Sequence, residues 1–132
     1  VRRIGLLADR LSVNIELPSE ASLSLLAPDK KKQAILKPMG QIAVQSAQSK
    51  KELVLYRHAP AFAPAGQSTQ MIIGATPESD RHIMGLAESL YKKYSLKRVF
   101  FSAYLPVNSD SRLPAAFAGT PAVPGGLAFA VL

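Results

Sequence analysis

Two apolar stretches decide the fold: Ser-Thr-Gln-Met-Ile-Ile-Gly (Ser68–Gly74) and Arg-Val-Phe-Phe-Ser-Ala-Tyr-Leu (Arg98–Leu105). Both have the length and composition of short buried strands. Between them, Asp80–Tyr94 predicts a helix, because apolar residues recur there at helical spacing: Ile83, Leu86, Ala87, Leu90, Tyr91 and Tyr94. A strand, a helix and a strand in this order indicate parallel strands joined by a crossover helix.

A third strand is predicted upstream, over Leu11–Leu17, where apolar and polar residues alternate strictly. Its polar face carries Ser12, Asn14 and Glu16. In an open sheet this face would lie in water. In a parallel sheet, whose two faces are normally covered, it would line a barrel interior or a cleft. A hydroxyl, an amide and a carboxylate on one face suit sugar hydroxyls or an amino group.

Two helices are predicted between the first two strands. We expect Ser19 to cap a short helix over Glu20–Leu26, and Asp29 to cap a longer one over Lys30–Val44. Glu52–Tyr56 fits either a strand or a helix end. The whole order predicts an α/β fold with about three parallel strands and crossover helices.

Composition excludes several classes of site. The chain has 132 residues, no cysteine, and 16 basic against 9 acidic residues, for a formal charge of +7. Without cysteine it can form neither a disulfide scaffold nor a thiolate metal centre. The beginning of the chain lacks the pattern of a signal peptide, and the uncharged stretch Leu113–Leu132 is broken by prolines and glycines. We therefore expect a cytoplasmic protein without a membrane partner.

The segment Gly74–Ser79 follows a predicted strand and precedes a predicted helix, the place where parallel α/β folds bind ligands. A tight turn with a helix cap explains the same residues. Ser102 and Tyr104 share one face of the last strand, where packing is the simpler role. Basic residues are frequent in the first 58 positions, and they suit either phosphate contacts or a solvated helix face: Lys30, Lys31, Lys32, Lys37, Lys50, Lys51 and Arg57.

Three long runs resemble the radical S-adenosylmethionine proteins assigned to DNA modification or repair: Leu7–Glu20, Phe62–Asp80 and Leu90–Asn108. The resemblance covers roughly Ile4 to Pro114. It implies that residues 1–114 form the second half of a partial (β/α) barrel, with S-adenosylmethionine and a four-iron, four-sulfur cluster as the cofactors of the full-length family.

The resemblance also implies which residues lie near S-adenosylmethionine. In that superfamily the polar face of the fourth strand lies near the ribose and methionine moieties, a turn after the fifth strand contributes backbone, and the sixth strand passes the adenine. Gly74–Ser79 matches this turn only loosely, because its proline lies one position away from the proline of the family's turn. By position the implied cofactor-binding residues are Ser12, Asn14, Glu16, Gly74, Thr76, Glu78, Ser102 and Tyr104.

The chain departs from the family at both ends. The family's Cys-x3-Cys-x2-Cys motif belongs to the N-terminal half-barrel that this chain lacks, so the chain itself cannot bind the cluster. Residues 115–132 are an uncharged Ala/Pro/Gly run where the family continues with a charged helix. We interpret this run as an irregular and non-native tail, produced by a frameshift.

The sequence thus predicts a fragment of a radical S-adenosylmethionine iron–sulfur protein of DNA modification or repair, inactive by itself. The alternative is a non-enzymatic basic α/β module that binds nucleic acid, with DNA as its partner, through the basic residues between Lys30 and Arg57.

Overall fold

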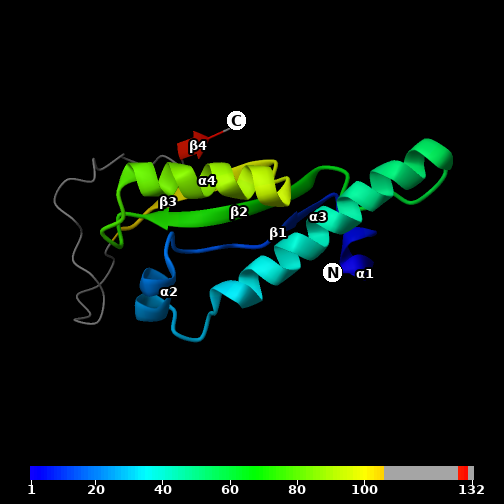
Figure 1. Ribbon diagram of the computed structural model, residues 1–132. Helices are drawn as coiled ribbons and strands as arrows, with labels where there is room; N and C mark the ends of the chain where they lie inside the picture. The colour runs from blue at the N-terminus through cyan, green and yellow to red at the C-terminus, as the bar shows by residue number, and fades with distance from the viewer. Residues whose placement is uncertain (106–127, 131–132) are drawn as a thin grey trace.

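The computed structural model describes residues 1–105 and 128–130 of the chain (Figure 1). The elements in chain order are α1 (Arg2–Gly5), β1 (Arg10–Ser12), α2 (Glu20–Leu26), α3 (Lys32–Leu55), β2 (Gly66–Ile73), α4 (Asp80–Tyr94), β3 (Arg98–Ala103) and β4 (Ala128–Ala130). No helix in this described part of the chain is long and apolar enough to cross a membrane.

The strands form one sheet in the order β1-β2-β3-β4 (Figure 1). β1 pairs with β2 and β2 with β3 in parallel, whereas β4 joins β3 antiparallel. The connection from β1 to β2 contains α3, and the connection from β2 to β3 contains α4. The structure therefore confirms the predicted α/β fold with three parallel strands and crossover helices.

β4 lies inside the tail for which we predicted irregular structure. Ala128–Ala130 pair with Val99–Phe101 of β3, so these three residues are a strand and not irregular. The remaining residues of the 115–132 tail lie outside the described part of the chain. The interpretation of the tail as non-native therefore stays a prediction.

Both crossover helices pack against the same face of the sheet. Met39 of α3 and Leu90 of α4 belong to one buried cluster, together with Met71 of β2 and Val99 of β3. Because strand side chains alternate between faces, the neighbouring Gln70 and Phe100 project from the opposite face. α2 covers that opposite face near the carboxyl ends of the strands, where the apolar cluster of Leu23 includes Ile72.

The N-terminal strand is shorter than predicted. Regular pairing ends at Ser12, and after an interruption a single bridge joins Glu16 to Met71. Ser12 pairs with Ser68 and Glu16 pairs with Met71. Four residue steps along the N-terminal segment therefore correspond to three steps along β2. One extra residue is therefore accommodated as in a β-bulge, which strict sequence alternation does not reveal.

The long helix differs from its predicted bounds at both ends. Its N-cap residue is Lys31 and not Asp29, because Pro28 and Asp29 form a turn before it. The helix then continues through Pro38 and past the predicted end at Val44 to Leu55, so Glu52–Tyr56 is a helix end and not a strand. Helix α2 with its Ser19 cap, and α4, have the bounds that the sequence predicts.

We predict that Met71→Ala lowers the free energy of unfolding by about 2–5 kcal/mol, because the side chain is fully buried at the centre of the main core. Met84→Ala is the matched control, since Met84 lies on α4 with 48% of its surface exposed. It should cost less than about 0.5 kcal/mol. Urea unfolding followed by circular dichroism measures both. Equal losses would contradict the assignment of the core.

Candidate functional site

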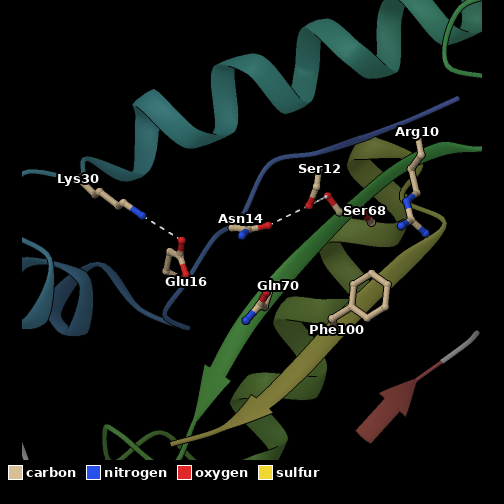
Figure 2. A pocket seen from close by; sticks show the side chains of 8 residues that line it. All are labelled: Arg10, Ser12, Asn14, Glu16, Lys30, Ser68, Gln70 and Phe100. Atoms are coloured by element: carbon tan, nitrogen blue, oxygen red, sulfur yellow. Dashed lines mark hydrogen bonds and ion pairs between the residues drawn. The ribbon is translucent and has the colours of Figure 1, made fainter. Parts of the chain in front are cut away.

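The face of the sheet opposite α3 and α4 contains an open polar cleft of about 500 Å³ (Figure 2). Residues from all three parallel strands, from the segment after β1 and from the α2–α3 loop line it: Arg10, Ser12, Asn14, Glu16, Lys30, Ser68, Gln70 and Phe100. The predicted polar set Ser12, Asn14 and Glu16 is therefore brought together in a cleft.

The bulge keeps Glu16 on the cleft side. Glu16 N donates to Gln70 O at 3.0 Å, and Ile72 N donates to Glu16 O at 2.7 Å. In the interrupted segment Ile15 N donates to the side-chain hydroxyl of Thr69 at 3.0 Å, in place of a ladder carbonyl. Glu16 itself has a left-handed backbone with φ of 64°, which few non-glycine residues adopt. Flanking hydrogen bonds hold this conformation.

Charged groups of both signs meet at one end of the cleft. Lys30 Nζ lies 2.9 Å from Glu16 Oε1, and both side chains are partly exposed. Lys30 was predicted to lie within a helix, among the nucleic-acid contacts. The structure places it in the loop before α3 and in the cleft, because the helix begins only at Lys32.

Short polar contacts and one ring contact order the remainder of the cleft (Figure 2). Ser12 Oγ donates to Asn14 Oδ1 at 2.8 Å, and the Arg10 guanidinium lies 5.8 Å from the centroid of the Phe100 ring. Gln70 Nε2 donates to Ser102 Oγ at 3.0 Å. Ser102, a predicted site residue, is thereby linked to the cleft through Gln70.

A second, mainly apolar pocket of about 310 Å³ adjoins the cleft at the same ion pair. Glu16 and Lys30 line both spaces. The other lining residues come from the α2 region, from β2 and from the segment after β3: Leu17, Leu26, Ala27, Ile72, Ala75 and Tyr104. Tyr104, predicted from the third strand, therefore lies in the apolar pocket.

The predicted site residues in the loop after β2 line neither the cleft nor the apolar pocket. Gly74 has a left-handed backbone with φ of 86°, which allows the turn out of the strand, and Thr76 is buried. The Glu78 carboxylate accepts hydrogen bonds from the hydroxyls of Ser19, at 2.5 Å, and Ser22. Glu78 lines neither the cleft nor the apolar pocket. Its hydrogen bonds join this loop to the start of α2.

The other predicted basic residues lie apart from the cleft, as its lining shows. Lys31, Lys32 and Lys37 lie at the beginning of α3, whereas Lys50 and Lys51 lie near its end. Lys32 and Lys50 are eighteen residues apart, or roughly 27 Å along the helix axis. Arg57 follows the helix.

The sequence reading missed four cleft residues: Arg10, Ser68, Gln70 and Phe100. For Ser68 and Gln70 the sequence does contain a signal. Ser68 and Gln70 are polar residues two positions apart along β2, as Ser12 and Asn14 are in the segment that pairs with it. Their alignment with Ser12 becomes visible only in the parallel register, which pairs Ser12 with Ser68.

Comparison with protein-family models, with curated protein sequences and with solved structures finds no match to this chain.

We predict that Glu78→Gln destabilises the protein by about 1–2 kcal/mol at neutral pH, because hydrogen bonds to a charged group are stronger than those to an amide. Burial opposes ionisation of Glu78 and raises its pKa, but hydrogen bonds from Ser19, Ser22, Thr76 and the backbone together outweigh it and lower the pKa from 4.5 to about 2. A lowered pKa stabilises the folded state above pH 4.5, and this contribution is lost as the pH falls towards 2.

The difference between wild type and variant, measured by urea unfolding, should therefore shrink from pH 7 to pH 2.5. Glu20→Gln is the control, because Glu20 is an exposed carboxylate of the same helix region. A difference that stays constant over this pH range would contradict the role of the charged carboxylate.

Proposed function

We propose that this chain is the S-adenosylmethionine-binding half of a radical S-adenosylmethionine protein. The observation that carries the proposal is the polar cleft next to an apolar pocket on the face of the sheet opposite the crossover helices. In a (β/α) barrel, helices cover the outer face of the strands and the inner face lines the interior.

The cleft residues fit the chemistry of S-adenosylmethionine. The volume of about 500 Å³ lies in the range of small-molecule sites. Glu16 can accept hydrogen bonds from the amino group of the methionine moiety, and Lys30 can pair with its carboxylate. The ammonium and carboxylate groups of these two residues lie 2.9 Å apart, so one zwitterionic ligand can contact both. The apolar pocket with Tyr104 suits the adenine.

The chain does not fit the iron–sulfur cluster. Cluster irons need thiolate ligands, and the sequence contains no cysteine. The described residues also contain no group of three or more histidine, aspartate or glutamate side chains placed to hold a metal ion. In this proposal the cluster belongs to the N-terminal half-barrel. When both cofactors are bound, the reduced cluster would supply the electron that cleaves S-adenosylmethionine, and this chain would supply binding and orientation.

We predict that the chain binds S-adenosylmethionine, and that Glu16→Gln weakens binding roughly ten- to hundredfold. The reason is the loss of a charged hydrogen bond worth about 1.5–3 kcal/mol. Asn14→Ala and Lys30→Ala should weaken binding as well. Isothermal titration calorimetry on the 132-residue chain measures the affinities.

Lys31→Ala is the matched control for Lys30→Ala. Lys31 is its exposed neighbour and does not line the cleft. It should leave the affinity unchanged. If Lys31→Ala abolishes binding while Glu16→Gln retains it, the cleft is not the site and the proposal fails.

The nucleic-acid alternative keeps one supporting observation. In the described part of the chain, Lys31, Lys37, Lys50, Lys51 and Arg57 are exposed and make no ion pair. They are spread along and just beyond α3, where they can contact phosphates without base selectivity.

For this alternative we predict that affinity for a duplex falls steeply with salt, and that a Lys50→Ala, Lys51→Ala double variant reduces the slope by about two in a logarithmic plot. Fluorescence anisotropy with a labelled 20-mer at 50–200 mM salt measures this. Because the cleft lies outside this surface, Glu16→Gln should leave the slope unchanged. If the affinity for the duplex did not depend on the salt concentration, the nucleic-acid alternative would be excluded.

A further inference from the structure

Two arginines lie on the face of the sheet that carries the polar cleft, one on each side of β2. Arg10 begins β1 and lines the cleft. Arg98 begins β3, two positions before Phe100. Residues two apart in a strand share a face, so Arg98 projects from the same face as Phe100, opposite the buried Val99. Arg98 does not itself line the cleft, but it pairs with Ser68, which does.

The strand register places the two arginines within reach of one ligand group. Ser12, Ser68 and Arg98 form one row across β1, β2 and β3, and Arg10 lies two positions before Ser12. Strand spacing and rise put the Cα atoms of Arg10 and Arg98 roughly 12 Å apart. The Arg10 side chain extends across β2, because its guanidinium lies 5.8 Å from the centroid of the Phe100 ring (Figure 2). It thereby ends beside the strand that carries Arg98.

The positive charge of both arginines is unpaired within the described residues. Arg10 and Arg98 are exposed, and neither makes an ion pair there. The cleft lining contains one carboxylate, that of Glu16, and it is paired with Lys30. The contact with the Phe100 ring restricts the Arg10 guanidinium without neutralising it. An anion at Phe100 therefore meets two positive charges and displaces no carboxylate.

We propose that Arg10 and Arg98 form a binding site for a phosphate monoester. Each guanidinium presents a planar fork of donors that matches phosphate oxygens, and two such groups match the two negative charges of a monoester. The remainder of the ligand extends into the cleft, whose volume of about 500 Å³ accepts a small molecule. S-adenosylmethionine has one carboxylate and no phosphate, so this ligand is a second molecule. The proposal therefore goes beyond the function proposed above and does not depend on it.

The test is a titration of the 132-residue chain by ¹H–¹⁵N nuclear magnetic resonance at about pH 8 and constant ionic strength. Methyl phosphate is the probe, because it carries two negative charges at this pH. Dimethyl phosphate is the matched control probe, because it has one negative charge and resembles the phosphodiester of a nucleic acid. Methyl phosphate should bind at least tenfold more tightly, and it should shift the backbone amide signals of Ser12, Ser68 and Arg98.

Variants separate this site from general charge attraction. Arg10→Gln and Arg98→Gln should each weaken binding of methyl phosphate at least fivefold, with the amide dispersion of the folded chain retained. Arg81→Gln is the matched control, because Arg81 is an exposed arginine of α4, which covers the other face of the sheet. It should leave the affinity unchanged. The proposal is overturned if methyl phosphate does not bind, if dimethyl phosphate binds equally well, or if Arg81→Gln weakens binding as much as Arg10→Gln.

Discussion

The backbone of β2 is the element on which the rest of the structure depends. Along one edge it pairs with β1 and then with residues 13–16, and along the other edge it pairs with β3. Its side chains divide the molecule, since Met71 lies in the core under α3 and α4 while Ser68 and Gln70 line the cleft. If β2 did not pair with β1 and β3, these strands would no longer form one sheet for α3 and α4 to cover.

The two ends of β2 carry different chemistry. Near its carboxyl end, the bulge at Glu16 and the turn that precedes α3 bring a carboxylate and an ammonium group together between a polar and an apolar space. Such a boundary suits a ligand that is charged at one end and flat and apolar at the other. Near its amino end, the buried Gln67 side chain joins α3 to α4, because its Nε2 donates to Met39 O and to Tyr94 O.

The loop residue Glu78 shows how a predicted site residue can have a structural role. Its carboxylate follows a strand and precedes a helix, which is the usual place of a ligand-binding group in parallel α/β folds. In the structure its hydrogen bonds go to Ser19 and Ser22 at the start of α2. The two serines are more than fifty residues away in sequence, so the partner of Glu78 is set by the packing of α2 against the sheet.

The sequence by itself determined the strands at β2 and β3, the bounds of α2 and α4, and the common face of Ser12 and Asn14. These features depend on local periodicity and capping, which involve neighbouring residues only. Only the tertiary structure decided that Lys30 meets Glu16, and that Gln70 and Phe100 complete the cleft. These meetings depend on the register of strands 56 residues apart and on a bulge held by Thr69, an interaction with no local signature. α3 also extends to Leu55, because an established helix propagates through a polar stretch whose own pattern is weak. In this half of the helix the buried Ser49 hydroxyl accepts a hydrogen bond from Phe62 N at 3.0 Å, a contact with the loop before β2.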